Sequence, residues 1–525
     1  MLSFRRLAAT FLALAAAAAL LIAISVGKQP DAGSAVTSLQ FSRGTLQSLS
    51  PHPANPTSMA FGPDGRLYVT TESAIRALAL SSDGKSVTNS EVIASGLSLV
   101  LGIAFDPTEP SSPVTFYVSR QEPAAPVGYN GTISKYTGPG PTWTRTDVIT
   151  GLPTSEPNLN HMTNGIAFNP QGVLYIAQGS ASDASLPVVN GTPTYWNETP
   201  LSAAILVADI HAAAFNGAIT YSPSGPPETD NIDQAGGDVH VFAPGLRNPY
   251  DLVLHTNGRL YATDNGPIGG PSSATCNTET SSAAVSQSDE LNLIVQGGYY
   301  GFPNRNRGRA DARQCTYHPP EQASGADWTA PIAVLPAHCS CDGIAEYTAN
   351  AFGGKLLGNL LIAQYGLGGL GRVQLTSDGM GVSSTMTLAN GFRGPLDVVV
   401  GPTGIIYVAE HDGERITYLA PIGGTPGGPT ATRTPTATRT PAAPTPTQLA
   451  TVAPSPTPAL AGDVNCDGLV TAIDAALVLQ YSAALVSHLP CPAGGDVNSD
   501  GRVDPIDATL ILQYVAGLLE ALPPH

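Results

Sequence analysis

Between residues 50 and 422 the chain repeats a short pattern of apolar and polar positions. An apolar stretch leads into a turn rich in Pro, Asp, Asn or Gly, and a second apolar stretch containing Tyr follows. The clearest copies are AFGPDGRLYV (60–69), AFNPQGVLYI (167–176), LVLHTNGRLYA (252–262) and VVVGPTGIIYVA (398–409). Each copy is typical of a β-hairpin closed by a tight turn.

Two degenerate copies, at 103–118 and 353–363, bring the number of hairpins to six. Repeated hairpins with insertions between them are typical of blades arranged in a closed ring. The sequence therefore predicts an all-β, six-bladed β-propeller over residues 50–422. A β-sandwich is the alternative, but a sandwich does not need six similar hairpins over so long a stretch.

The repeat also predicts which polar side chains lie together. Seven positions before the end of the first strand, three copies carry His161, Arg247 and Arg393. Equivalent positions in different blades lie at similar height around the central axis, so we expect these three side chains to converge at one mouth of the channel. Such a pocket suits a small polyanion or a polarised carbonyl. Alternatively, each arginine caps a loop or pairs with a nearby carboxylate.

Charge and composition narrow the function class. The formal net charge is −17 and only 12% of the residues are charged, which excludes a nucleic-acid binder that works by neutralising phosphates. Residues 1–27 carry two arginines near their start, Arg5 and Arg6, and continue as an uncharged apolar run, which indicates an export signal. The run is also close to bilayer-spanning length, so an uncleaved membrane anchor is the alternative. Either reading predicts a secreted or cell-surface protein.

The six cysteines fit an oxidising compartment. Four of them lie in or near insertions of the repeat region, and we expect disulfides that staple those insertions: Cys276, Cys315, Cys339 and Cys341. Their connectivity cannot be deduced. The His338-Cys339-Ser340-Cys341 stretch could instead form a metal or redox element. The remaining two, Cys466 and Cys491, are expected to bridge.

Residues 423–460 are rich in Thr and Pro and nearly without bulky apolar side chains. Such a segment cannot bury a core and is typical of an extended, semi-rigid linker. It separates the repeat region from a second module at residues 461–525.

The second module contains two calcium loops of the EF-hand type. DVNCDGLVTAID (463–474) and DVNSDGRVDPID (496–507) start 33 residues apart (496 − 463). The spacing of oxygen donors predicts two sets of metal ligands. They are Asp463, Asn465, Asp467, Leu469 (main chain) and Asp474, and Asp496, Asn498, Asp500, Arg502 (main chain) and Asp507. A short helix follows each loop, with Ile473, Leu477 and Tyr481 on one face of the first and Ile506, Leu510 and Tyr514 on one face of the second.

This duplicated loop and helix resembles the type I dockerin family over the whole module. The resemblance implies folding on calcium binding and a cohesin-like protein partner. Where many dockerins of cellulosomes carry Ser-Thr, this chain has Ala472-Ile473 and Pro505-Ile506.

Residues 245–303 contain GLRNPYDLVLHTNGRLYATDNGP and SDELNLIVQGGYYGFP. Their order resembles the glucose/sorbosone dehydrogenase family, the fold of soluble quinoprotein glucose dehydrogenase. The resemblance implies an aldose dehydrogenase that uses pyrroloquinoline quinone and calcium. It assigns His161 as general base, Arg247 beside the quinone carbonyls and Asn248 as a cofactor contact. The main-chain carbonyls of Gly266 and Pro267 would bind the calcium ion.

The chain departs from this family at several positions. The family's aspartate that orients the histidine falls on Ser180, and a glutamine falls on Leu97. The lysine expected in 360–375 is absent, and the two arginines of the last blade are reduced to Arg393, which becomes the remaining candidate contact for the cofactor.

These departures leave a second hypothesis open. The propeller could be a non-catalytic glycan- or protein-binding domain in an extracellular polysaccharide-degrading or cell-surface assembly. A hydrolase is a third reading, but the sequence suggests no carboxylate pair in the propeller to support it.

Overall fold

The structure is a computed structural model with two units, residues 1–434 and 435–525. It describes residues 39–46, 53–123, 125, 128–138, 143–155, 161–182, 188–189, 192–193, 197–224, 231–267, 288–422, 461–464, 470, 472–482, 489, 491–515, 519 and 521–522. The predicted signal or anchor (1–27) and the linker (423–460) lie outside this part of the chain.

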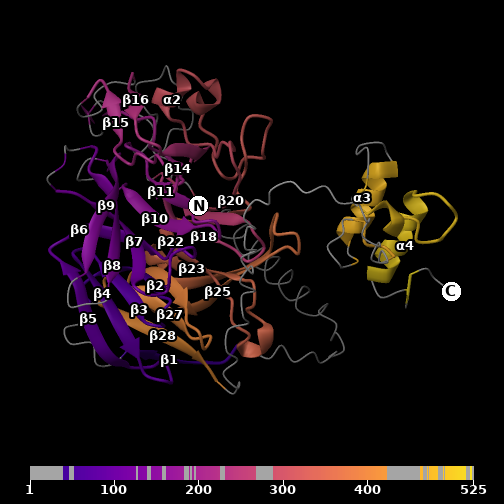
Figure 1. The fold of residues 1–525 in the computed structure, drawn as a ribbon, viewed down its shortest axis with the longest axis horizontal. Coiled ribbons are helices and arrows are strands. Elements are labelled where there is room, and N and C mark those ends of the chain that lie inside the picture. Colours follow the sequence, from indigo (N-terminus) through magenta and orange to yellow (C-terminus); the bar gives the residue numbers. More distant parts are fainter. Residues whose placement is uncertain are drawn as a thin grey trace, which may run out of the picture. The chain divides into compact units, whose positions relative to one another are not determined.

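The first unit contains six antiparallel sheets of four strands each, which confirms the predicted six blades (Figure 1). Blades 1 to 3 are β2 (Pro56–Phe61), β3 (Leu67–Thr71), β4 (Ala74–Leu80) and β5 (Val87–Ser95); β6 (Ser98–Ala104), β7 (Val114–Gln121), β8 (Gly131–Gly138) and β9 (Thr144–Leu152); and β10 (Thr163–Phe168), β11 (Leu174–Gln178), β14 (Ala204–Ala208) and β17 (His240–Pro244). Blades 4 to 6 are β18 (Pro249–Leu254), β19 (Leu260–Asp264), β20 (Ser288–Ile294) and β21 (Ala333–Ala337); β22 (Cys341–Glu346), β23 (Leu360–Gln364), β24 (Gly369–Leu375) and β25 (Val382–Asn390); and β26 (Pro395–Val400), β27 (Ile406–Glu410), β28 (Arg415–Pro421) and β1 (Phe41–Thr45).

The ring is closed by the two ends of the propeller. The first strand of each blade contacts the first strands of both neighbouring blades, from β2 through β26 and back to β2. Strand β1 pairs with β28 and so completes the last blade with a segment from the start of the chain. The propeller therefore extends N-terminally beyond the predicted boundary at residue 50, because β1 lacks the hairpin pattern that marks the other strands.

The tyrosine of the repeated hairpin packs between neighbouring blades. Tyr261 and Tyr407 are fully buried. The Tyr261 hydroxyl donates to the Gly379 carbonyl of blade 5 (2.7 Å), and the Tyr407 hydroxyl donates to the Gly84 carbonyl of blade 1 (2.8 Å). Each ring thus fills the space between two blades while its polar end is satisfied.

The inner strands approach one another closely at Gly343 in β22. A Cβ atom at this position would lie 2.5 Å from Asp397 Cα in β26. We expect Gly343→Ala to lower the free energy of unfolding by about 1–3 kcal/mol, because two backbones would have to separate. Urea denaturation checks this. Gly381→Ala is the matched control: its nearest atom would be at 3.7 Å, so equal effects of the two substitutions would contradict the expectation.

Short elements lie between the blade strands. They are the hairpins β12 (Val188–Val189) with β13 (Thr192–Pro193) and β15 (Thr220–Ser222) with β16 (Asp233–Gly236), the helix α2 (Arg305–Gly308), and the 3-10 turns Ala312–Cys315, Phe352–Gly354 and Tyr365–Leu367.

The disulfide pairing of the cysteines differs in part from the predicted stapling of insertions. Cys339 and Cys341 are bonded to each other. This bond closes a local ring at the start of β22 instead of stapling an insertion, and it occupies the thiols that a metal element would need. Cys315 and Cys491 are also disulfide-bonded. Cys276 and Cys466 lie outside the described residues.

The second unit contains α3 (Ala472–Ser482), a 3-10 turn (Pro492–Gly494) and α4 (Pro505–Val515). Its core includes Val464, Val497, Ala508 and Ile511. The predicted apolar face of the second helix is confirmed only in part: Leu510 packs against this core, but Ile506 is 56% exposed while Asp507, Ala508 and Ile511 are buried. The buried face of α4 differs from the predicted one because Asp507, which closes the loop, points inward. Ala508 and Ile511 lie on the same face of the helix and are buried with it.

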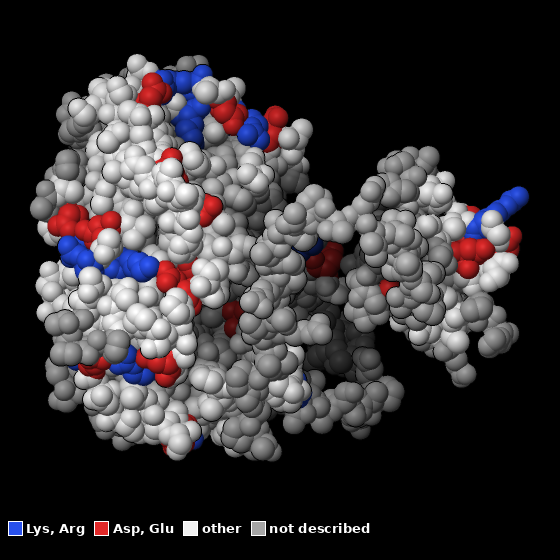
Figure 2. Space-filling view, in the orientation of Figure 1, with Lys and Arg blue, Asp and Glu red and all other residues white. Residues whose placement is uncertain are grey.

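The distribution of surface charge agrees with the exclusion of a nucleic-acid binder. On the face drawn in Figure 2, basic side chains lie beside acidic ones and form no continuous basic surface. Within the described part of the chain, no helix is long and apolar enough to cross a membrane.

Candidate functional site

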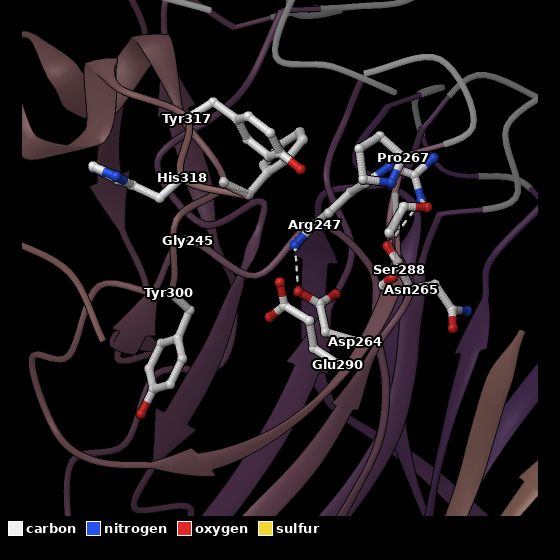
Figure 3. A pocket seen from close by; sticks show the side chains of 12 residues that line it. Gly245, Arg247, Asp264, Asn265, Pro267, Ser288, Glu290, Tyr300, Tyr317 and His318 are labelled. Atoms are coloured by element: carbon white, nitrogen blue, oxygen red, sulfur yellow. Dashed lines mark hydrogen bonds between the residues drawn. The ribbon is translucent and has the colours of Figure 1, made fainter. Parts of the chain in front are cut away.

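A pocket opens beside blade 4, at the ends of β18, β19 and β20 (Figure 3). Polar groups line it together with aromatic rings: Gly245, Arg247, Asp264, Asn265, Gly266, Pro267, Ser288, Glu290, Tyr300, Phe302, Tyr317 and His318. The pocket therefore contains three of the residues predicted from the sequence, namely Arg247, Gly266 and Pro267.

Asp264 fixes the main chain that carries Arg247 and Asn248. Its carboxylate accepts the backbone N–H of Arg247 (3.0 Å) and that of Asn248 (2.7 Å). Asp264 is the last residue of β19 and is buried. Since both of its oxygens bind this turn, the carboxylate holds the two candidate side chains at the start of the inner strand.

Asp264 lies directly opposite Glu290 in the pairing of β19 with β20. Figure 3 shows the two carboxyl groups side by side near Arg247. Burial raises the pKa of Asp264 to about 7. Burial and the negative charge of Asp264 raise the pKa of Glu290 well above its usual range. Like charges facing each other across strands repel, so the negative charge of Asp264 adds to the effect of burial on the pKa of Glu290.

This pair corrects the expectation that the propeller has no paired carboxylates. The sequence hides it, because 26 positions separate Asp264 from Glu290 (290 − 264) and only the strand register brings them together. A hydrolase does not follow from it, because both Asp264 oxygens are engaged by backbone N–H groups.

The Arg247 guanidinium points at main-chain oxygens of the predicted calcium site. Its Nη1 donates to the carbonyls of Asn265 (3.0 Å) and Gly266 (3.1 Å). These carbonyls, with Glu290 close by, form a set of hard oxygen donors that suits calcium. The donor set fits the ion, provided that Arg247 releases the Gly266 carbonyl.

His161 lies beside the turn that carries Arg247 and Asn248. Its side chain is 4% exposed, and a Cβ placed on Gly179 would lie 2.9 Å from both His161 Cβ and Asn248 Oδ1. Burial and the positive charge of Arg247 lower the pKa of His161 well below its usual range. The imidazole is therefore neutral at physiological pH and can accept a proton.

Arg393 differs from the other two members of the predicted trio. It is exposed, whereas His161 and Arg247 are buried, and its backbone N–H donates to Glu410 (2.6 Å). Arg247 lines the pocket, and neither His161 nor Arg393 is among its lining residues. The repeat places Arg393 at the equivalent point of blade 6, and the convergence of all three side chains stays a prediction.

Asn248 keeps the residue of the family pattern, whereas Leu97 departs from it. Asn248 Oδ1 accepts from Asn164 Nδ2 (2.9 Å), so this side chain also joins blades 3 and 4. Leu97 packs against the apolar cluster that contains Val100 and Ile103, where a glutamine would have offered polar groups.

In the second unit, the structure describes the whole of the second predicted calcium loop, residues 496–507. Asp496 accepts the backbone N–H groups of Asp500 (3.0 Å) and Gly501 (2.8 Å). Asn498 Nδ2 donates to Asp500 (3.0 Å). The loop therefore gathers the side chains at positions one, three and five, and Gly501, with φ +88°, supplies the sharp turn at position six.

The closing aspartates are equivalent in the two loops. Asp507 accepts the backbone N–H of Val497 (2.9 Å), and Asp474 accepts that of Val464 (3.0 Å). Both carboxylates are fully buried. Three predicted ligands of the first loop, Asn465, Asp467 and Leu469, lie outside the described residues.

Residues 53–417 match the family model described as Glucose / Sorbosone dehydrogenase. The chain belongs to this family. Residues 461–516 match the Dockerin type I domain, so a dehydrogenase-family propeller and a dockerin occur in one chain.

The propeller is similar to quinoprotein glucose dehydrogenase B of Acinetobacter calcoaceticus, with 24% identity over 262 residues, 47% of this chain and 50% of that protein. The match thus spans half the length of this relative. A structure from Thermus thermophilus, described as a putative oxidoreductase (glucose dehydrogenase), has 21% identity and a TM-score of 0.50, covering 72% of this chain and 100% of its own. The PQQ-bound aldose sugar dehydrogenase of Streptomyces coelicolor has 20% identity and a TM-score of 0.47, covering 73% and 98%.

Proposed function

We propose that the propeller is an exported aldose dehydrogenase that uses pyrroloquinoline quinone and calcium. The observation that carries the proposal is the buried, neutral His161 beside Arg247. When bound, the quinone supplies the hydride acceptor. His161 would take the proton from the sugar hydroxyl. Arg247 would stabilise negative charge that develops on the cofactor, and the carbonyls of Gly266 and Pro267 would hold the calcium ion.

We also propose that the C-terminal module binds two calcium ions and docks the enzyme to a cohesin-like domain outside the cell. Support comes from the dockerin match and from the described second loop. The apolar run at residues 1–27 supports export, as a signal or as an anchor.

A non-catalytic propeller that binds glycan or protein remains the second candidate. It is favoured by Ser180 in place of an aspartate and by the absence of lysine in 360–375. Each lost charge-assisted contact weakens cofactor binding by about 1.5–3 kcal/mol.

Calorimetric titration of pyrroloquinoline quinone into the full chain with calcium present separates the two candidates. We expect saturable binding that depends on calcium, followed by dye reduction with an aldose. Arg247→Met should weaken binding about 10- to 100-fold, since a charge-assisted contact is lost. Arg76→Met is the control, because Arg76 lies on β4, the third strand of blade 1 from the central axis, and donates to Ser90. The absence of binding at several hundred micromolar cofactor would favour the non-catalytic propeller.

A further inference from the structure

The hydrogen bonds of Ser180 determine which nitrogen of His161 carries the proton. Ser180 Oγ lies 2.9 Å from His161 Nδ1, and the same hydroxyl donates to the carbonyl oxygen of Ser182 (2.5 Å). A hydroxyl has only one hydrogen, and a carbonyl can only accept. Ser180 must therefore accept from His161, so that Nδ1 carries the proton and Nε2 is left as the basic nitrogen.

A buried carboxylate holds the turn that receives the Ser180 proton. Glu198 is 1% exposed. Its oxygens accept the backbone N–H groups of Ala181 (3.0 Å) and Ser182 (3.1 Å), and the hydroxyls of Ser182 and Ser202 (both 2.5 Å). Four donors thus fix the carboxylate, and through it the main chain whose carbonyl binds Ser180.

We propose that Glu198 is a positioning residue for His161: it holds the 180–182 turn so that Ser180 locks the imidazole in the Nδ1–H tautomer. The carboxyl group is thereby placed two hydrogen bonds beyond Ser180, through the main chain of Ser182, and Ser180 occupies the position that the family pattern assigns to an aspartate. The use of Nε2 as a catalytic base rests on the proposed function, whereas the tautomer and its control by Glu198 do not.

Moving the carboxylate away has a chemical consequence. An adjacent aspartate would stabilise a protonated imidazolium, but a serine oxygen stabilises it much less. Burial and the positive charge of Arg247 lower the pKa of His161, and a hydrogen bond to the main chain of Ser180 only partly offsets them. The arrangement favours a histidine that stays neutral and keeps one tautomer over a wide pH range.

The test is nuclear magnetic resonance of the full chain labelled with 15N-histidine, without cofactor or sugar. The His161 signals are assigned by their loss in His161→Gln. We expect a neutral ring with protonated Nδ1 between about pH 5.5 and 8, because the pKa of His161 lies well below its usual value of about 6.5. Ser180→Ala and Glu198→Gln should both populate the Nε2–H tautomer. Ser180→Thr, which keeps a hydroxyl, should restore the original spectrum.

Glu109→Gln is the matched control, because Glu109 is a partly buried carboxylate that binds Lys135 and Tyr117 in blade 2. It should leave the His161 signals unchanged. If Glu198→Gln does not fold, Ser202→Ala removes one of the four donors and should shift the tautomer in the same direction. An Nε2–H tautomer in the unmodified protein, or unchanged His161 signals in folded Glu198→Gln, would overturn the proposal.

If the protein oxidises aldoses, Glu198→Gln should lower kcat by about tenfold or more and leave KM nearly unchanged, because orientation of the base is lost and not binding of the sugar. Failure of cofactor binding would leave the tautomer result intact, so the two proposals fail separately.

Discussion

Replacement of His161 by glutamine is expected to lower kcat for aldose oxidation by about 10²- to 10⁴-fold, the usual contribution of a positioned general base. The side chain is buried next to Arg247, and Ser180 holds its Nδ1. Glutamine preserves polarity and approximate size but cannot accept a proton at neutral pH. Steady-state dye reduction with calcium and pyrroloquinoline quinone measures the effect.

His240→Gln is the control for this substitution, because His240 lies on β17 of the same blade and is exposed. Its activity should equal that of the unmodified protein. Cofactor affinity should change little in either variant. A His161→Gln protein that keeps its turnover would show that another group takes the proton, and would remove the main support for the proposed mechanism.

Removal of calcium is expected to unfold the C-terminal unit and leave the propeller folded. Asp496 and Asp500 lie in one short loop, and the buried Asp507 closes it. Without a cation these carboxylates repel one another, and the small core around Val497 and Ile511 cannot compensate. Far-ultraviolet circular dichroism should lose the helical signal of α3 and α4 on addition of a chelator and regain it with excess calcium.

Substitution of a single predicted ligand also tests whether the fold of the C-terminal unit depends on calcium, without removing the ion from the solution. Asp507→Asn should weaken calcium binding by about 10- to 100-fold, because one charge-assisted contact is lost. Ser482→Ala is the control, because Ser482 lies at the exposed end of α3, outside both loops, where its hydroxyl donates to the Leu479 carbonyl (2.9 Å). A helical signal that is indifferent to chelator would contradict a calcium-dependent fold.

The repeat region shows which features of a propeller are local. Each hairpin carries its own alternation of apolar residues and its own turn, so six blades could be counted from the sequence and were confirmed. Strand β1 was missed because a lone strand has no hairpin pattern. Its place follows only from pairing with β28, more than 370 residues later (415 − 41 = 374).

The candidate site also has some features that follow from the sequence and others that depend on tertiary contacts. The spacing of the repeat and the family resemblance both predict His161 and Arg247 as site residues from the sequence. The same spacing places Arg393 at the equivalent point of blade 6, where the residue is exposed and its main chain is bonded to Glu410. The helices of the second unit were located correctly, but their buried face depends on the inward position of Asp507.

Local sequence patterns were sufficient to predict the six hairpins of the propeller, the two helices of the second unit and the spacing of the calcium-type loops, because these features depend on residues close to one another along the chain. The tertiary structure alone decided the pairing of Asp264 with Glu290, the contact of Arg247 with the Gly266 carbonyl, and the link from Glu198 through Ser180 to His161. Those contacts arise from strand register and from the close approach of neighbouring segments in the ring, and burial then sets the protonation of the groups involved.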